Sequence, residues 1–418
     1  MWELKILVLG GRYDSYSVGG VRKYLTSVLP YLASSHEIVV LAAKRFTERN
    51  LLRDFSQPVL DSRLGVRYVT SMNFRPVPYS WAFWLILRKT FATLNLYKKW
   101  QFDVIYSHEW VDGTVGRIVA SLLKKLGRSI KHIHHPHGVV SFVTGIERFQ
   151  WHRRNPLWGL ILRFITYNEK RNVQSANAVI MFTKYHAKLG EKWGAKIVYP
   201  IPNGVDTQKF NPNVDCASFI DKFKIPNNAK KIVYCGRVII IKGVEHLIAA
   251  VAQVAQILPD IVLVIVGDFP QFPKSYWKEI ANRYGVSDKV RFTGAVEDYE
   301  VPQAMRMADV YCQLTAPYYG FEISLMEACA CGVPCIAVDC EERREVFRDA
   351  VAYVPWANPE KTGKIIIDLL MDDHSRRELG NTAHSLALEY DWKRIAGELM
   401  QTLGVIYREG RASSKEHY

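Results

Sequence analysis

The 418-residue sequence contains no long hydrophobic run. A membrane-spanning helix needs about 20 consecutive apolar residues, and no stretch of this chain approaches that length. The first apolar run, residues 6–9, resembles the core of a secretion signal but is too short, and Gly10-Gly11 follows it at once. We therefore expect a buried first strand there instead. With 49% hydrophobic and 23% charged residues, the composition is typical of a soluble globular protein.

Cysteine is scarce and confined to the second half of the chain. All seven cysteines lie at or after Cys216, and their number is odd. Four of them cluster in an apolar stretch, at positions 329, 331, 335 and 340, but this spacing matches none of the paired patterns of zinc sites. We therefore expect small buried thiols in a reducing compartment, no metal centre, and a cytoplasmic protein.

Acidic residues are few in the first half. Residues 1–200 hold 30 Lys and Arg against 12 Asp and Glu, a net charge of +18, whereas the remainder holds 25 against 29, a net charge of −4. A basic half should meet an anionic partner such as a membrane surface, a lipid phosphate or an acidic glycan. Helix-turn-helix, zinc-finger and RNP-type signatures are absent from the sequence, so we expect no nucleic acid partner.

Two stretches of the basic half, residues 81–99 and 149–171, mix cations with aromatic residues. An amphipathic helix of this composition can lie in a membrane interface, with its apolar side chains buried and its cations near lipid phosphates. An ordinary core helix with a solvated basic side explains the pattern equally well. Peripheral binding to the cytoplasmic face of a membrane therefore stays open from the sequence alone.

Short apolar runs alternate with helical patterns along the chain. In the first half a helix follows Gly19-Gly20 and should end or bend near Pro30, and strands are expected at residues 5–9, 37–41, 66–70, 102–106, 130–134 and 178–182. In the second half they are expected at residues 231–235, 261–266, 290–293, 310–314 and 334–338. This alternation predicts α/β domains with open, mostly parallel sheets.

A chain of this length should form two domains. The Pro, Asn and Gly residues of the segment 199–206 are typical of turns and mark the boundary. We expect an N-terminal domain over residues 1–200, a second domain over 201–391, a helix over 392–408 that packs back toward the first domain, and a frayed tail over 409–418. Both domains would be Rossmann-like, with parallel sheets facing across a ligand cleft.

Residues 236–243, Gly-Arg-Val-Ile-Ile-Ile-Lys-Gly, lie between an expected strand and an amphipathic helix pattern. The loop holds Arg237 and Lys242 beside the free amides of a helix start, and Gly236 and Gly243 allow the backbone to approach a ligand closely. Such a loop suits a diphosphate, because guanidinium groups and helix N-termini both bind phosphate oxygens. A solvated pair of surface cations is the alternative.

A second loop, residues 316–320, precedes a helix expected over residues 325–330. Glu327 near the start of that helix offers a carboxylate to the two vicinal hydroxyls of a ribose, and amides from Gly320 to Ile323 would face a phosphate or a sugar. An acid that only stabilises the helix dipole is the alternative. Together with the Arg237 loop, this segment predicts a sugar-nucleotide site.

Four histidines, at positions 132, 134, 135 and 137, end a strand expected in the first domain. Successive side chains on a strand point to opposite faces, so we expect no common zinc site. His108-Glu109 follows another expected strand and would either face the cleft or end the strand without chemistry. Gly19-Gly20 would either touch a phosphate or only allow a tight helix entry.

Several segments, in this order and spacing, resemble glycosyltransferase family 4 of the GT-B architecture. The resemblance covers nearly the whole chain, and although each segment is weak alone, the set is specific. The segments are Gly19-Gly20-Val21, Ile201-Pro202-Asn203-Gly204-Val205-Asp206, Gly236-Arg237 with Lys242-Gly243, Val266-Gly267-Asp268, Gly320-Phe321, Glu327-Ala328 and Ala330-Cys331-Gly332-Val333-Pro334.

The resemblance implies transfer with retention of anomeric configuration and without a bound metal, in line with the lack of an Asp-x-Asp motif in this sequence. It also implies roles for individual residues. It assigns the donor diphosphate to Arg237, Lys242 and the Gly19-Gly20 loop, the ribose to Glu327, the base to the backbone around Val296, and the donor-sugar pocket to His137.

The sequence departs from the family pattern at Tyr319. The family has two glutamates separated by seven residues, and the first, which contacts the transferred sugar, would fall at this position. Glu322, three residues on, would supply the missing carboxylate, or Tyr319 would donate its own hydroxyl. Phe321 and Ile323 complete the same donor-binding loop.

We therefore expect a retaining glycosyltransferase that moves a hexose from a nucleoside-diphosphate sugar to a hydroxyl acceptor, either lipid-linked or on a growing glycan. Its expected catalytic residues are His137, Glu322, Arg237 and Lys242, with no cofactor and no metal. The alternatives are an epimerase or phosphorylase on the same fold, or a non-catalytic protein that binds sugar nucleotides.

Overall fold

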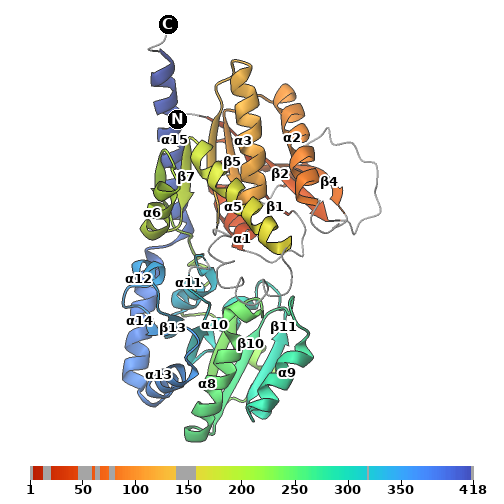
Figure 1. Cartoon of the computed structure of the whole chain (residues 1–418). Coiled ribbons are helices and arrows are strands. Elements are labelled where there is room, and N and C mark those ends of the chain that lie inside the picture. Colours follow the sequence, from red (N-terminus) through yellow and green to blue (C-terminus); the bar gives the residue numbers. More distant parts are fainter. Residues whose placement is uncertain are drawn as a thin grey trace. The chain divides into compact units, whose positions relative to one another are not determined.

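The computed structural model divides the chain into two compact units (Figure 1). Unit 1 comprises Met1–Asn203 and Trp392–Tyr418, and unit 2 comprises Gly204–Asp391. The structure describes residues 3–12, 20–45, 59–61, 66–74, 81–137, 157–317 and 320–415. Within these residues no helix combines the length and the apolar composition needed to cross a bilayer.

Unit 1 is built on an eight-stranded sheet in the order β3-β4-β2-β1-β5-β6-β7-β8. Every neighbouring pair is parallel except β3 and β4, which are antiparallel. The strands are β1 (Lys5–Arg12), β2 (Glu37–Arg45), β3 (Val59–Asp61), β4 (Val66–Phe74), β5 (Val104–His108), β6 (Lys131–His135), β7 (Ala178–Met181) and β8 (Val198–Pro200). The long apolar strands of the first half thus form the predicted, mostly parallel sheet.

Helices cover both faces of this sheet, and the central strands β1, β2 and β5 alternate their side chains between two apolar clusters. Ile6 and Val8 of β1 pack on α1 and α15, whereas Leu7 and Leu9 pack on α2 and α3. The helices of unit 1 are α1 (Gly20–Ala33), α2 (Trp81–Lys99), α3 (Glu109–Lys125), α5 (Leu157–Ser175), α6 (Lys184–Lys192) and α15 (Trp392–Lys415).

The C-terminal helix is longer than expected. It runs through Lys415, so residues 409–415, expected as a tail, are helical. No proline interrupts this stretch, and a single glycine such as Gly410 costs a helix only about 1 kcal/mol. Its apolar stripe, which includes Ile395, Leu399 and Leu403, is fully buried in the core of unit 1.

Unit 2 contains a six-stranded sheet in the order β11-β10-β9-β12-β13-β14. All of its strand pairs are parallel. The order is that of a Rossmann sheet, with the reversal between its first and fourth strands. The strands are β9 (Lys230–Cys235), β10 (Ile261–Val266), β11 (Val290–Gly294), β12 (Val310–Gln313), β13 (Cys335–Val338) and β14 (Ala352–Val354).

Both faces of the second sheet are also covered. All six side chains of β10 are buried, three in each of two apolar clusters, which explains its unbroken run of Val, Ile and Leu. The helices are α7 (Ala217–Lys222), α8 (Val244–Ile257), α9 (Lys274–Arg283), α10 (Val301–Arg306), α11 (Ile323–Ala330), α12 (Glu341–Phe347), α13 (Pro359–Met371) and α14 (Asp373–Leu388), with short 3-10 turns η1 (Ile240–Lys242) and η2 (Ser287–Lys289).

Candidate functional site

The two loops singled out in the sequence leave neighbouring strands of unit 2. The strand order reverses between β9 and β12, which pair directly. Loops that leave the carboxyl ends of two such strands diverge to opposite sides, and the opening between them is the usual ligand site of these sheets. The Arg237 loop follows β9 and the Gly320 loop follows β12, so both begin at this point.

The loop after β9 brings Arg237 and Lys242 to the start of α8. Arg237 is exposed, and its carbonyl oxygen accepts a hydrogen bond from the Tyr234 hydroxyl at 2.8 Å. Lys242 ends the short turn η1, and α8 begins at Val244 after a single left-handed residue, Gly243. The predicted strand, loop and helix are therefore confirmed, and both cations lie at the carboxyl edge of the sheet.

Gly243 fixes this loop against the segment that follows β12. Its φ is +70°, and a Cβ atom there would lie only 2.2 Å from the carbonyl oxygen of Leu314. A backbone hydrogen bond of 2.9 Å from Ala316 N to Ile241 O adds a second connection. The backbones of the two loops therefore contact each other directly.

The helix after the second loop, α11, begins at Ile323, two residues before the expected start. The amides of Leu325 and Met326 already donate to the carbonyl of Glu322, which closes the first turn early. Glu327 therefore lies in the second turn, and the prediction that it starts the helix is wrong. It is 3% exposed. Since the helix dipole acts on the first turn, the dipole alone does not explain this buried carboxylate.

The described residues of the expected donor-binding loop from Gly320 onward make local contacts. Gly320 has a φ of +106°, a value that favours glycine. Phe321 packs near the rings of Phe347 and Tyr390. Of the amides expected to face a ligand, that of Ile323 donates to Phe321 O at 3.1 Å.

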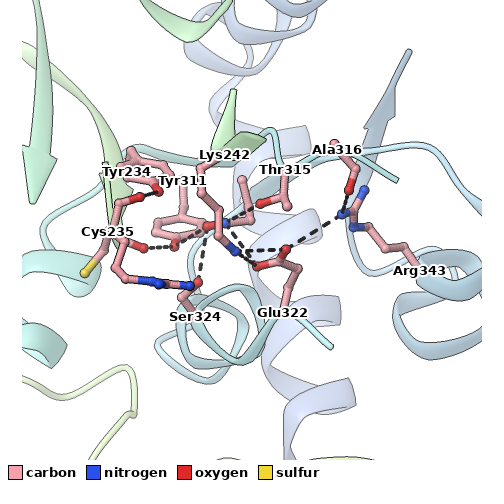
Figure 2. Close-up of polar contacts among 11 residues, drawn as sticks. Tyr234, Cys235, Lys242, Tyr311, Thr315, Ala316, Glu322, Ser324 and Arg343 are labelled. Carbon is pink, nitrogen blue, oxygen red and sulfur yellow. Dashed lines mark hydrogen bonds and ion pairs between the residues drawn. The ribbon is translucent and has the colours of Figure 1, made fainter. Parts of the chain in front are cut away.

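A buried ion pair joins the two loops. Lys242 Nζ lies 3.0 Å from Glu322 Oε2 and 3.2 Å from Oε1, and the two side chains are 13% and 4% exposed. Arg343 of α12 approaches the same carboxylate, with its Nη2 3.8 Å from Glu322 Oε1. Figure 2 shows Lys242 and Arg343 on opposite sides of Glu322.

Burial and charge act against each other at this pair. Burial raises the pKa of Glu322, but Lys242 and Arg343 outweigh it and hold the pKa below its ordinary value. Burial lowers the pKa of Lys242; Glu322 opposes this shift, while Arg343 and Arg237 add to it. The site therefore combines one ionised carboxylate with three cations and has an excess of positive charge for an anionic ligand.

A network of buried polar side chains forms hydrogen bonds with Glu322 (Figure 2). Gln313 Nε2 donates to Glu322 Oε2 at 3.1 Å and to Thr315 Oγ1 at 2.8 Å. Gln313 Oε1 accepts from the hydroxyls of Tyr311 and Ser324. These satisfied hydrogen bonds fix the carboxylate in one orientation.

Four further residues were expected in the donor site, and the structure describes two of them. Val296 is half-buried after β11 and packs against the core cluster that contains α11. Tyr319, the departure from the family pattern, lies outside the described residues, as does Gly19 in unit 1. Gly20 is described and is the first, exposed residue of α1.

The histidines of β6 alternate between the two faces of the sheet, as predicted. His132 and His134 both lie within 3.0 Å of Ser107 Oγ on one face. On the other face the rings of His135 and His137 stack with their centroids 3.8 Å apart. His137 Nε2 lies 2.6 Å from Nδ1 of His108. We expected His108 to come after the strand, but it is the last residue of β5.

Burial keeps these imidazoles neutral. It lowers the pKa of His137 to about 3 and that of His134 to about 4, and it moves the pKa of His108 in the same direction. His137 also has a φ of +55°, a strained value for a residue other than glycine, and such strain clusters at functional sites. A neutral, rigidly held imidazole at the carboxyl edge of the sheet can exchange hydrogen bonds with a sugar.

His108, His135 and His137 carry ring nitrogens within 4.8 Å of one another. Tetrahedral zinc ligands, with bonds near 2.0 Å, lie roughly 3.3 Å apart, and His108 and His137 already share a hydrogen bond. We assign no metal to this group. Among the described residues no cysteine joins such a group either, and none of the seven cysteines forms a disulfide.

Sequence reasoning missed two side chains of the site, Gln313 and Arg343. Gln313 is a polar residue inside an apolar strand, which is itself a signal, because a buried amide needs partners. Arg343 is 2% exposed and donates to the carbonyls of Val338 and Ala316, both at 3.1 Å. It lies in a run of charged residues typical of an exposed helix, so the sequence carries no signal for it.

Two family models match the chain in succession. Residues 18–209 match Glycosyltransferase Family 4, and residues 217–385 match glycosyl transferases group 1. A fold of two Rossmann-like units with a cationic site at the switch point of the second defines a GT-B protein. The chain belongs to glycosyltransferase family 4, as its motifs predicted.

Similar proteins agree with this family. A phosphatidyl-myo-inositol mannosyltransferase of Mycolicibacterium smegmatis is 30% identical over 217 residues, which are 50% of this chain and 52% of that protein. A GDP-mannose-dependent alpha-(1-6)-phosphatidylinositol dimannoside mannosyltransferase of Mycobacterium tuberculosis is 23% identical over 93% of both chains. The match spans about half the length of the phosphatidyl-myo-inositol mannosyltransferases.

Solved structures share the whole fold. The sucrose-phosphate synthase of Thermosynechococcus elongatus superposes with a TM-score of 0.78 at 20% identity, over 98% of this chain and 100% of that one. The predicted α/β class and GT-B architecture are confirmed.

Proposed function

We propose that the protein is a retaining glycosyltransferase that moves a hexose from a nucleoside-diphosphate sugar to a hydroxyl of a lipid-linked acceptor or a growing glycan. The observation that carries this proposal is the meeting of two loops at the switch point of unit 2. There Lys242 and Glu322 form a buried ion pair, and the exposed Arg237 of the same loop adds positive charge. The relatives described above are named as mannosyltransferases, which supports the same reaction class.

The cations of the β9 loop act on the leaving group. Negative charge grows on the diphosphate as its bond to the anomeric carbon breaks, and preorganised cations stabilise that charge most strongly where water is excluded. Lys242 meets this condition, since its side chain is only 13% exposed. Arg237, which is exposed, would bind phosphate oxygens from the solvent side in a fork.

The acceptor hydroxyl attacks the anomeric carbon from the face on which the diphosphate departs. The new C–O bond forms as the bond to the phosphate oxygen breaks, and the departing phosphate takes the acceptor proton. The configuration is retained without a protein nucleophile. Glu322 holds Lys242 in place for this step, and neutral His137 lines the donor-sugar pocket.

The other site residues bind the rest of the donor. Glu327 accepts hydrogen bonds from the ribose hydroxyls, and the backbone around Val296 contacts the base. The loops at Gly19-Gly20 and at Tyr319–Ile323 contact the diphosphate and the sugar. We propose that no metal and no cofactor take part.

We propose that the basic first half of the chain binds the acceptor. Its net charge of +18 over residues 1–200 suits an anionic membrane surface or a lipid phosphate, and we place the protein at the cytoplasmic face of a membrane as a peripheral protein. The relatives named above carry phosphatidylinositol compounds in their names, so such a lipid is the first acceptor to test.

A transfer assay tests the proposal. The protein is incubated with GDP-mannose, UDP-glucose or ADP-glucose, each labelled in the sugar, and with phosphatidylinositol or a total lipid extract. We expect label in the lipid fraction with one donor, and an α linkage by NMR from these α-linked donors. Label that never leaves any donor contradicts transfer, and a changed sugar with donor alone indicates an epimerase.

A further inference from the structure

Helix α2 of unit 1 exposes a stripe of large apolar side chains. Phe83 is 62% exposed, Trp84 49%, Leu87 36% and Phe91 61%. Positions 84, 87 and 91 follow the helical period, so they share one face, and Phe83 lies beside them. Large contiguous apolar surface of this kind marks an interaction site and is not expected on a fully solvated helix.

The opposite face of α2 packs against α3, so the apolar stripe faces outward. Ile86 packs in the core cluster with α3, and Thr93 is fully buried. Lys89 Nζ and Asp112 Oδ1 form a buried ion pair of 2.5 Å between α2 and α3. Rotation of α2 about its own axis would break this ion pair, so the aromatic residues stay on the outer face.

The exposed face of α2 carries cations and no acid. Arg88, Lys98 and Lys99 are exposed, and the helix contains no Asp or Glu. Helix α5 also packs on α3 (Figure 1). It continues this composition with exposed Phe164, Tyr167 and Arg163. The face therefore combines apolar anchors with positive charge.

We propose that the outer face of α2 docks unit 1 on an anionic phospholipid surface, with Phe83, Trp84, Leu87 and Phe91 in the interface and Arg88, Lys98 and Lys99 at the lipid phosphates. Charge complementarity selects this occupant. In a symmetric dimer the same stripe would face itself and oppose cations to cations. Lysine is also depleted at protein interfaces, whereas it suits a lipid headgroup.

The position of the stripe fits a lipid-linked acceptor, and in this respect the inference rests on the proposed function. β4 ends at Phe74, and α2 begins at Trp81. The aromatic half of α2 therefore lies toward the carboxyl edge of the parallel sheet, the edge at which β5 ends with His108. Docking there brings a membrane lipid to the side of unit 1 where ligands bind.

Vesicle co-sedimentation tests the inference with the whole protein and without any donor. The probes are vesicles of pure phosphatidylcholine and of phosphatidylcholine with 30% phosphatidylglycerol. We expect binding to the anionic vesicles that weakens at high salt. Trp84→Ser with Phe91→Ser should lower the partition coefficient at least tenfold, and Arg88→Gln with Lys98→Gln and Lys99→Gln roughly a hundredfold, since each surface cation contributes roughly fivefold.

A matched control replaces two exposed apolar residues of unit 2, Ile257→Ser with Met371→Ser, which are 59% and 67% exposed. These changes should leave vesicle binding unaltered. Equal loss in the control, no binding by the wild type, or a wild-type dimer that the α2 variants dissociate would each overturn the inference. Transfer to a short-chain acceptor in solution is measured in parallel, so that failure of docking is distinguished from failure of the transferase proposal.

Discussion

At the scale of single residues, the candidate site depends on one carboxylate between two cations. Glu322 pairs with Lys242, and 80 residues separate the two along the chain. The sequence pattern predicted the strand, loop and helix that carry Arg237 and Lys242, because glycine spacing and residue type are local; their phosphate-binding role stays a prediction. It did not predict the pairing, because that contact depends on how two loops pack.

The first prediction concerns Glu322→Gln, which keeps the shape and removes the charge. Leaving Lys242 and Arg343 buried without a counter-charge should lower the free energy of unfolding by about 3 kcal/mol. Glu322 also opposes the fall in the pKa of Lys242 caused by burial. In the variant that pKa drops further, so Lys242 should lose its charge, and the protein its nucleoside diphosphate, at a lower pH than in the wild type.

Titration of diphosphate binding between pH 6 and pH 10 measures this shift. Asp309→Asn is the control, because Asp309 accepts the amide of Lys231 at the opposite edge of the same sheet. It should leave the pH dependence unchanged. If Glu322→Gln keeps diphosphate binding at every pH and loses only the intact nucleotide sugar, Glu322 contacts the sugar instead and the positioning role is wrong.

At the scale of helices, strands and loops, long apolar segments were predictable and short ones were not. β10 matches its expected bounds because six consecutive buried residues leave a clear pattern. β3, β8 and β14 have three residues each and carry too little pattern to be recognised. The start of α11 was placed two residues late, since Ser324 is a residue typical of an N-cap and so predicts a helix that begins at the next position.

The glycine that joins the two site loops gives a prediction at this scale. Gly243 and Gly285 have nearly the same φ, +70° and +72°, so Ala at either position should cost roughly 1 kcal/mol for the left-handed backbone. Only Gly243 faces a backbone oxygen at 2.2 Å, while nothing lies within 4 Å of a Cβ atom at Gly285. Gly243→Ala must therefore displace the loop that holds Lys242.

We expect Gly243→Ala to weaken nucleoside diphosphate binding at least tenfold and to lower the thermal midpoint more than Gly285→Ala does. Gly285→Ala should leave binding intact. Calorimetric titration of the three proteins gives the comparison. Equal affinities for wild type and Gly243→Ala would show that the loop geometry does not control the phosphate site.

At the scale of the whole molecule, the chain forms two Rossmann-like units, and we propose that they divide the function between them. The alternation of strands and helices predicted two α/β domains, but the strand orders could not be predicted, because they depend on pairings between distant segments. The order determines the site, since it makes β9 and β12 neighbours across the reversal. The charge asymmetry between the two halves was visible in the sequence and supports donor binding in one unit and an anionic acceptor surface on the other.

The central claim is that Arg237 and Lys242 hold a nucleoside diphosphate, and calorimetric titration with GDP, UDP and ADP tests it most directly. We predict that the wild type binds one of them and that Arg237→Ala and Lys242→Ala each weaken binding about ten- to a hundredfold, the worth of one charge-assisted hydrogen bond. Lys278→Ala and Arg283→Ala, exposed cations of α9, should bind as the wild type does. Unchanged affinity in both Arg237→Ala and Lys242→Ala would contradict the account.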